Sequence, residues 1–448
     1  MSEFSQYTEA LHEECGVFGM YDKTGETDMV SAVYSALYAL QHRGQESCGI
    51  ALNVDGVLSG HRDLGLVSEV FTKRVLEELP RGAKMATGHV RYATAGQRSR
   101  SNAQPMVLHH CKGAMAVCHN GNLVNAPKLR RKLEMSGSIF HGTSDTESIA
   151  YSIVEERLHS KSTEEAIEKI MPRLQGAFSC VVMTATKLIA FRDPKGFRPL
   201  CLGKTADDAY VVASESCALD SIGAHFVRDI APGEIVVISK EGVRSITTHC
   251  GGPRHICVFE YIYFARPDSV IEGVSVQHAR MRAGAYLAKE HPVDADIVIG
   301  VPDSGLDAAL GYAQESGIPY GIGFIKNTAT ENSTAADTSV LLMDVAPVFA
   351  AMLDDMQELV PTPVIAARFH SALVDAVVNV AELVRATYGI EIMALAGGVF
   401  MNRYLMERTL ARLQERGFTV ALNKELPPND ASISYGQAVL GLQAQHEE

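Results

Sequence analysis

The sequence predicts a layered α+β domain over about the first 250 residues and α/β segments in the remainder of the chain. In the first part, residues 176–193 and 208–216 are rich in β-forming residues and are bounded by Gly, Asp and Lys turns. Helical patterns lie between such runs. From residue 274 the pattern becomes helix, turn, buried strand and loop, as at the start of a parallel α/β unit.

Individual elements follow from apolar spacing and from capping residues. Residues 28–44 have apolar side chains at helical spacing, and this helix is predicted to stop at Gly44. Residues 162–174 predict a second helix, with Ser162 or Thr163 as its N-cap. Beyond a polar stretch that reads as a linker, the same criteria predict a helix over 363–389, a strand over 391–398, a helix over 402–417 and a strand over 418–423.

Composition limits the class of protein. The chain has 448 residues, enough for two to four domains, and 46% of them are hydrophobic. The formal net charge of −13 argues against a nucleic-acid partner. No apolar run is expected to approach a membrane span, and the acidic start lacks the apolar region of a secretory signal. Nine scattered cysteines suit reduced thiols, so a cytoplasmic protein with no membrane partner is expected.

Cys15, within the stretch LHEECGVFGMY, is the first candidate for chemistry. Buried structural cysteine is the commoner role for a residue of this type. If residues 1–14 are removed, however, Cys15 carries both a thiol and a free α-amino group. Those two groups could serve as a nucleophile and its base within one residue.

Polar motifs downstream supply the other groups that glutamine hydrolysis needs. Arg91 and Thr94 follow a predicted strand, Asn120 and Gly121 are expected at a tight turn, and Asp145 is expected at a helix start. A guanidinium can bind an α-carboxylate, a carboxylate can hold an α-ammonium, and two N–H donors can stabilise an oxyanion. Taken singly, each motif favours a structural role: a turn, a surface ion pair or a helix cap.

Together and in this order, these motifs resemble the glutamine phosphoribosylpyrophosphate amidotransferases, or amidophosphoribosyltransferases, which open purine synthesis. The resemblance runs from about residue 11 to residue 327. The motifs that carry it are ECGVFGMYD, YALQHRGQESCGIA, GHVRYATAG, HNGNLVNA, TSDTESIA, GFRPLCLG, YVVASESCALD and FEYIYFARPDS.

The resemblance implies a four-layer αββα glutaminase domain of the N-terminal-nucleophile class. It also implies removal of residues 1–14, with Cys15 as nucleophile and its α-amino group as base. By the same resemblance, Asn120 and Gly121 form the oxyanion hole. The glutamine backbone is then held by Arg91, Thr94 and Asp145.

The second half of that family's reaction uses phosphoribosyl pyrophosphate with Mg²⁺. The segment VIGVPDSG, residues 298–305, resembles the family's pyrophosphate loop, which assigns Asp303 and Ser304 to the phosphates; alone it also fits an ordinary strand-to-helix turn. After residue 327 the family's apolar strand with two adjacent aspartates and its 5-phosphate loop are missing. Cys257 matches the first of four iron–sulfur ligands, but no cysteine follows it, so no cluster is expected.

The tail resembles the C-terminal end of the carbamoyltransferases that mature nickel–iron hydrogenases. In that family a Gly-Gly turn lies against nucleotide and an aspartate helps to hold a metal; here those positions are Gly397, Gly398 and Asp430. The family's paired-histidine motif is missing. A Gly-Gly turn is more often only a turn, so the tail is interpreted as a fragment of an actin-like ATPase-type fold without activity of its own. The segments that carry this resemblance are 363–377, 394–418 and 427–440.

The two resemblances meet near residue 327, as in a fusion. The predicted function is glutamine-dependent formation of 5-phosphoribosylamine, with the transfer step impaired because the transferase half is truncated. The enzyme is expected to be a homo-oligomer. Two alternatives remain: a carbamoyl-transfer or nucleotide-binding protein with a non-catalytic first module, and an inactive scaffold. The predicted divisions are a propeptide 1–14, a type 2 glutamine amidotransferase domain 15–250, a partial phosphoribosyltransferase domain 251–327, a linker 328–339 and a carbamoyltransferase-like fragment 340–448.

Overall fold

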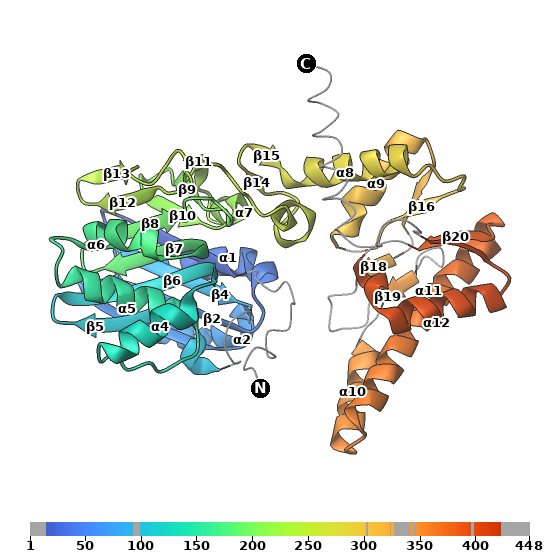
Figure 1. The fold of residues 1–448 in the computed structure, drawn as a ribbon, viewed down its shortest axis with the longest axis horizontal. Coiled ribbons are helices and arrows are strands. Elements are labelled where there is room, and N and C mark those ends of the chain that lie inside the picture. The colour runs from blue at the N-terminus through green and yellow to red at the C-terminus, as the bar shows by residue number, and fades with distance from the viewer. Residues whose placement is uncertain are drawn as a thin grey trace. The chain divides into compact units, whose positions relative to one another are not determined.

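The chain divides into two compact units, residues 1–276 and 277–448 (Figure 1). Predictions for the leader, Thr94, the linker, Gly397 and Asp430 lie outside the described residues. The computed structural model describes residues 15–92, 99–301, 303–322, 324–326, 341–343, 346–395 and 398–422.

Two antiparallel sheets form the centre of the first unit. The seven-stranded sheet has the order β11-β9-β10-β1-β4-β2-β3, and the six-stranded sheet has the order β13-β12-β8-β7-β6-β5. The strands of the first sheet are β1 (Gly16–Tyr21), β2 (Ser47–Val54), β3 (Val57–Leu64), β4 (Met85–Arg91), β9 (Cys201–Lys204), β10 (Tyr210–Ala213) and β11 (His225–Asp229). Those of the second are β5 (Met106–His110), β6 (Gly113–Leu123), β7 (Gly176–Thr184), β8 (Leu188–Arg192), β12 (Ile235–Ser239) and β13 (Gly242–Ile246).

Three apolar layers hold these sheets between helices. One core joins the seven-stranded sheet to α1, α2 and α7, a second lies between the sheets, and a third joins the six-stranded sheet to α4, α5 and α6. The fold is therefore the four-layer αββα arrangement that the sequence predicts (Figure 1). The helices are α1 (Met29–Ala39), α2 (Val67–Val70), α3 (Lys73–Glu78), α4 (Ala126–Met135), α5 (Asp145–Arg157), α6 (Thr163–Ile170) and α7 (Ser216–Asp220).

Helix ends follow the local chemistry of the sequence. Helix α1 begins after Asp28, whose carboxylate accepts from the backbone N–H of Ser31, and it gives way to a 3₁₀ turn, Gln41–Arg43, before Gly44. Helix α6 is capped by Ser162, the first of the two predicted candidates.

The end of the first unit carries a π-helical turn, Glu260–Phe264, and a short hairpin of β14 (Val270–Ile271) and β15 (Val274–Ser275). Residues 251–276 therefore group with the glutaminase-like unit, although the sequence places 251–327 in one segment. Backbone hydrogen bonds tie this stretch to the segment between β8 and β9, including His255 N–H to Lys195 O and Cys257 N–H to Phe197 O.

The second unit is built from parallel strand pairs and helices. Strand β16 pairs in parallel with β17 across α9, and β20 pairs in parallel with β21 across α12, as the helix–strand pattern predicts. The predicted buried strand at β16 is only half-buried. The elements are α8 (Val276–Glu290), β16 (Val298–Ile299), α9 (Gly305–Ser316), β17 (Tyr320–Gly321), β18 (Phe324–Lys326), β19 (Leu341–Met343), α10 (Ala346–Gln357), α11 (Thr362–Tyr388), β20 (Ile392–Leu395), a 3₁₀ turn (Gly398–Met401), α12 (Arg403–Glu415) and β21 (Thr419–Leu422).

Helix α11 corrects one expectation from the sequence. Its residues 362–387 are long and apolar enough to cross a membrane by length and composition alone, so the statement that no run approaches a span is wrong. One face of the helix, with Val374, Val378 and Ala381, packs into a core with α12 and β20. A helix that contributes to the core of a globular unit passes the same length and composition test.

Candidate active site

Three of the predicted site residues, Cys15, Arg91 and Asn120, lie at one end of the layer between the two sheets. Side chains alternate along a strand, and Val17 of β1, Met85 of β4 and Ala116 of β6 all point into this layer. The same alternation directs His89, Arg91 and Asn120 into it. The inner layer is therefore apolar along most of its length and polar at the end where Cys15 directly precedes β1.

Hydrogen bonds across the layer confirm that the two sheets face each other here. The Thr87 hydroxyl lies 3.3 Å from the Cys118 thiol. Closer to the polar end, His89 Nε2 lies 2.9 Å from the backbone carbonyl of His119. Because a carbonyl can only accept, Nε2 carries the proton and Nδ1 is left with a lone pair.

Cys15 is buried at the start of β1, and its thiol lies 3.5 Å from the backbone carbonyl of Tyr92. Strand β1 pairs with β4, with Gly16 opposite Val90, so the nucleophile candidate lies beside the strand end that carries Arg91. The sequence expectation that Cys15 and Arg91 belong to one site agrees with this register.

Asn120 is fully buried, and neither polar atom of its side chain has a hydrogen-bond partner among the described residues. A buried amide without a partner costs free energy, typically about 1–3 kcal/mol for each unsatisfied group. Its Nδ2 is therefore a donor available to a bound ligand. His89 Nδ1 and the Ser47 hydroxyl are likewise buried without a partner in this part of the structure.

Gly121 occupies a position that only glycine can take. Its φ is +136°, and a Cβ added there would lie 2.2 Å from the carbonyl oxygen of Ala177. The prediction of a tight turn at Asn120 and Gly121 is wrong, because both residues lie inside β6, where Asn120 pairs with Ser179 and Gly121 with Phe178. The sequence correctly indicates that Gly121 needs a conformation that favours glycine, but the cause is the close approach of the neighbouring strand and not a turn.

Arg91 is buried and pairs with a carboxylate that sequence reasoning did not single out. Its Nη1 lies 3.2 Å from both carboxylate oxygens of Glu46, the glutamate of the QHRGQES motif. The alternative of a surface ion pair for Arg91 is thus wrong, because Arg91 and Glu46 do form an ion pair but both side chains are shielded from solvent. A buried guanidinium oriented by a carboxylate is suited to bind an anionic ligand.

Asp145 opens α5, but it does not cap the helix. The cap is Ser144, whose hydroxyl accepts from the Thr146 N–H, so the alternative of Asp145 as a cap is wrong. One Asp145 oxygen accepts from the Leu123 N–H at 2.9 Å, and the other lies 3.5 Å from His119 Nδ1. Burial alone would raise the pKa of Asp145, but His119 and the backbone donors outweigh burial and lower it. The carboxylate is therefore anionic beside the Asn120 strand.

Two further residues could have been anticipated from their motifs. His89 belongs to GHVRYATAG and His119 to CHNGN, and their spacing from Arg91 and Asn120 along the strands already fixes which sheet face they take. Burial lowers the pKa of His89 to about 3. His89 is therefore neutral at physiological pH.

The remaining predicted residues lie elsewhere. Asp303 and Ser304 stand at the start of α9 in the second unit, and Ser304 is its N-cap without a side-chain capping bond. Cys257 is half-buried in the first unit. Among the described residues, no three His, Cys, Asp or Glu side chains are placed to hold a metal ion.

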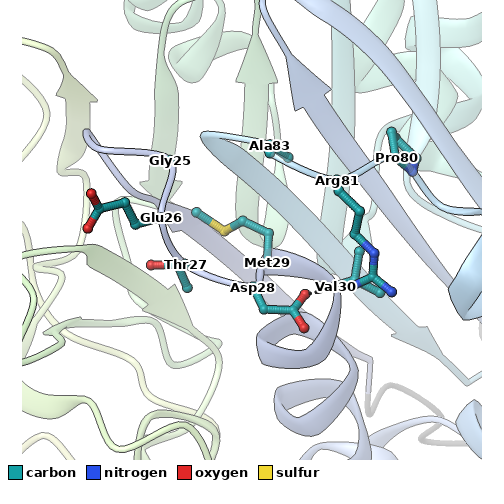
Figure 2. Close-up of a pocket in the computed structure, with 10 residues that line it drawn as sticks. Gly25, Glu26, Thr27, Asp28, Met29, Val30, Pro80, Arg81 and Ala83 are labelled. Atoms are coloured by element: carbon teal, nitrogen blue, oxygen red, sulfur yellow. Dashed lines mark hydrogen bonds and ion pairs between the residues drawn. The ribbon is translucent and has the colours of Figure 1, made fainter.

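A pocket of about 290 Å³ lies away from these residues, at the start of α1 (Figure 2). Residues 25–30 and 80–83 line it. Asp28 and Arg81 form an ion pair of 2.9 Å at its edge, and both side chains are more than half exposed. An exposed pair of this kind contributes little, so the pocket has no feature of a built site.

Comparison with family models identifies both parts of the chain. Residues 89–221 match the model of a glutamine amidotransferase domain. Residues 323–437 match the model described as carbamoyltransferase, Kae1-like domain, second subdomain. Both resemblances noted in the sequence are thereby confirmed.

Curated relatives match the larger, N-terminal part of the chain. The amidophosphoribosyltransferase of Archaeoglobus fulgidus is 46% identical over 313 residues, which cover 70% of this chain and 67% of the relative. That of Bacillus subtilis is 46% identical over 318 residues, covering 71% of this chain and 65% of the relative. That of Methanocaldococcus jannaschii is 44% identical, covering 70% of this chain and 69% of the relative. The chain thus matches about two thirds of the length of these relatives.

Solved structures agree. A glutamine phosphoribosylpyrophosphate amidotransferase from B. subtilis, complexed with ADP and GMP, superposes with a TM-score of 0.65 at 43% identity, covering 72% of this chain and 69% of that one. A structure described as the allosteric regulatory enzyme of purine biosynthesis gives a TM-score of 0.66 at 43% identity, covering 72% and 68%. With the αββα fold and the polar end of its inner layer, these matches show that the chain belongs to the amidophosphoribosyltransferase family.

Proposed function

We propose that this chain hydrolyses glutamine at Cys15 and passes the ammonia to phosphoribosyl pyrophosphate, with the second step impaired. The observation that carries the proposal is the polar end of the inner layer. There a buried thiol directly before β1, a buried guanidinium at the end of the neighbouring β4 and an unpartnered buried amide on β6 of the facing sheet lie at the same end of the layer. Each of these groups has a role in opening an amide bond.

In this mechanism the mature chain begins at Cys15. The thiol transfers its proton to the α-amino group as sulfur attacks the side-chain amide carbon of glutamine. The oxyanion that forms accepts hydrogen bonds from Asn120 Nδ2 and the Gly121 N–H. Collapse of the intermediate breaks the C–N bond, and the α-ammonium returns the proton so that ammonia leaves. Water then hydrolyses the thioester to glutamate and restores the thiol.

Substrate recognition is assigned to the charged residues around this centre. Arg91, oriented by Glu46, binds the α-carboxylate of glutamine, while Asp145 binds the α-ammonium, and Thr94 completes the site. The anionic state of Asp145 and the two-point hold on Arg91 support these roles. Opposite protein charges facing the α-carboxylate and the α-ammonium on the α-carbon of glutamine would select a free α-amino acid over a peptide, in which those groups are amides.

For the transfer step we propose that Asp303 and Ser304 bind the pyrophosphate of the substrate. Backbone N–H groups at the start of the twelve-residue helix α9 suit a phosphate group. Mg²⁺ would arrive with the substrate, and pyrophosphate oxygens and water would supply most of its ligands. We assign residues 251–327 to a partial phosphoribosyltransferase segment and 340–448 to an actin-like carbamoyltransferase fragment. The match of 323–437 to that second family supports a change of fold near residue 327.

The remaining attributes follow the family. We propose a cytoplasmic homo-oligomer that uses glutamine and phosphoribosyl pyrophosphate, in which Cys257 is a vestigial ligand position without an iron–sulfur cluster. All nine cysteines are free thiols in the structure, which suits a reducing compartment.

A coupled assay tests the proposal. With glutamine, phosphoribosyl pyrophosphate and Mg²⁺ present, glutamate is expected to accumulate well beyond phosphoribosylamine, and Cys15→Ala should abolish both. Intact-mass measurement should show a chain that begins at Cys15. Active protein that retains residues 1–14 would contradict the mechanism, because the α-amine would then be a peptide nitrogen. Equal amounts of the two products would contradict the impaired transfer step.

The match of 323–437 to a carbamoyltransferase subdomain favours one alternative, a nucleotide-binding protein with a non-catalytic first unit. That alternative predicts no glutamate from glutamine together with saturable binding of ATP by the full chain. Neither activity nor binding would favour an inactive scaffold.

A further inference from the structure

Strand β16 of the second unit lies between helices from the two segments that resemble different families. Among the described residues it pairs with β17 alone. A two-stranded sheet is at best marginally stable and needs an apolar face packed against another element. The chain leads directly from β16 to Asp303 and Ser304, the residues assigned above to pyrophosphate. The packing of β16 therefore affects where those two residues lie.

One face of β16 packs on α9. Gly300 follows the strand directly and is buried. A Cβ added at Gly300 would lie 2.9 Å from the Cα of Leu306 and 3.1 Å from the Cβ of Ala309, so a glycine is needed for this close approach to α9. Side chains alternate along an extended chain, which directs Ile297 and Ile299 to the opposite face.

That opposite face packs on α11, a helix of the carbamoyltransferase-like segment. Ile297 and Ile299 contact a buried apolar cluster of Val380, Val384 and Ile390. Val380 and Val384 are four positions apart on α11, and Ile390 comes just after the helix. The strand pair is thus covered by α9 on one face and by α11 on the other.

Strand β17 is shaped for the same contact. Gly321 pairs with Ile299 in the parallel register, so both positions lie on the face that meets α11. A Cβ at Gly321 would lie 2.5 Å from Cδ1 of Ile297. The absence of a side chain at Gly321 therefore makes room for Ile297 between the strands and α11.

The apolar surface of α11 is divided between two contacts. Val374, Val378 and Ala381 face the core with α12 and β20, whereas Val380 and Val384 face β16. With 3.6 residues per turn, the two sets point in directions roughly 100° apart. A helix that contributes to two cores needs apolar residues on more than one face. This division accounts for the length and apolar composition that α11 shares with a membrane span.

Helix α9 is fixed on its other side by direct contact with α8. A Cβ at Gly311 of α9 would lie 1.9 Å from the carbonyl oxygen of Met281, and one at Gly284 of α8 would lie 1.8 Å from that of Ala308. The two helix backbones therefore touch. If β16 loses its contact with α11, we expect the strand to shift relative to α9, and the residues assigned to pyrophosphate lie where the two meet.

We propose that α11 supplies a layer that the truncated phosphoribosyltransferase-like segment lacks, and that Val380 and Val384 are positioning residues for its pyrophosphate site. They support β16 on the face opposite α9 and so fix Asp303 and Ser304 at the start of that helix. The inference rests on the proposed function and adds residues from the second family to its transfer site. The two family resemblances then form one folding unit and not two linked modules.

The test is Val384→Ala in the full chain, with Val378→Ala as a matched control. Both valines are buried on the same helix, and both substitutions remove two methyl groups. They differ in the core that loses contacts: Val384 faces β16, and Val378 faces α12 and β20. The probe is phosphoribosyl pyrophosphate with Mg²⁺ and without glutamine, and calorimetry gives its Kd.

For Val384→Ala, peptides that cover 296–305 should exchange their backbone amides about tenfold faster, since two buried methyl groups change a local opening equilibrium by about this factor. The Kd should rise about 3- to 10-fold, because the site is then less preorganised. Val378→Ala should speed exchange in α12 and β20 instead and change the Kd less than about twofold. Glutamine hydrolysis should stay near wild type in both variants, because the residues assigned to it lie in the first unit.

Equal weakening of binding by both alanine variants would overturn the inference, because α11 would then act only through the stability of the whole unit. Unchanged Kd and exchange in folded Val384→Ala would overturn it as well. If Val384→Ala does not fold, Ile299→Val takes its place, since it removes one methyl group from the strand side of the same contact. Unchanged exchange over 296–305 in that variant would count against the inference.

Failure of the proposed function is separable from these outcomes. A wild-type chain that does not bind phosphoribosyl pyrophosphate would refute the assignment of Asp303 and Ser304, and the positioning role would fall with it. Glutamate formation by the same chain would still support the glutaminase half of the proposed function.

Discussion

His89 should make the first unit sensitive to acid, and the size of the effect follows from its burial. The side chain is fully buried, and its pKa is lowered to about 3, mainly by burial; the hydrogen bond to the His119 carbonyl opposes this shift, and the positive charges of Arg91 and His119 support it. In the unfolded chain a histidine has a pKa of about 6.5. Below that pH the unfolded state binds a proton that the folded state does not bind.

When the pKa of a histidine is lower in the folded state than in the unfolded state, the free energy of unfolding decreases as the pH falls below the pKa of the unfolded state. Each pH unit is worth about 1.4 kcal/mol, so His89 should lower the free energy of unfolding by about 2 kcal/mol at pH 5 relative to pH 8. This figure depends only on the folded pKa remaining below 5. Above about pH 7 His89 should have no effect on the pH dependence.

The variant His89→Gln isolates this contribution. The glutamine Nε2 can still donate to the His119 carbonyl, but the side chain does not titrate. Hydrogen exchange of peptides that cover β4 and β6, measured in urea between pH 8 and pH 5, gives the unfolding free energy of the first unit. The wild-type curve should fall about 2 kcal/mol further than the variant curve. Parallel curves would refute the assignment of His89 as a buried neutral side chain.

Three further outcomes test the site. Asn120→Ala should lower kcat for glutamine hydrolysis about 10²- to 10³-fold with little change in KM, as expected for one lost oxyanion donor; steady-state kinetics measures both, and a pure KM effect would contradict the role. Arg91→Lys should mainly raise KM, because the two-point hold of Glu46 on a planar guanidinium is lost; an unchanged KM would count against carboxylate binding by Arg91. Gly121→Ala should destabilise the first unit by more than about 1 kcal/mol through its positive φ and the close Ala177 carbonyl, which thermal unfolding detects; a stable, fully active variant would show that the strand can relax there.

Much of the architecture was predictable because local signals and tertiary packing agree. Ser162 caps α6 as its hydroxyl suggests, and α11, β20, α12 and β21 follow the apolar periodicity of the tail. These elements need only short-range information: a capping oxygen, a helical stripe or a short apolar run. The αββα layering came from the family resemblance, since strand order cannot be read from periodicity.

The errors arose where a local signal has more than one tertiary cause. Gly121 signals positive φ, and the sequence favours a turn, but the neighbouring strand β7 makes it a strand position. Asp145 follows a better cap, Ser144, and its carboxylate is drawn instead to Leu123 and His119. Helix α11 is apolar enough for a membrane span, and only its packing against α12 and β20 gives it a place in a core.

The sequence by itself determined the types of chemical group at the site and their order along the chain: the thiol at Cys15, the guanidinium at Arg91, the amide at Asn120 and the carboxylate at Asp145. Only the tertiary structure decided their partners. Glu46 lies beside Arg91, and Glu260 lies beside Arg43 although 217 positions separate the two in the chain. Side-chain type is written residue by residue, whereas burial and pairing depend on which strands meet across a sheet, and those contacts join segments far apart in sequence.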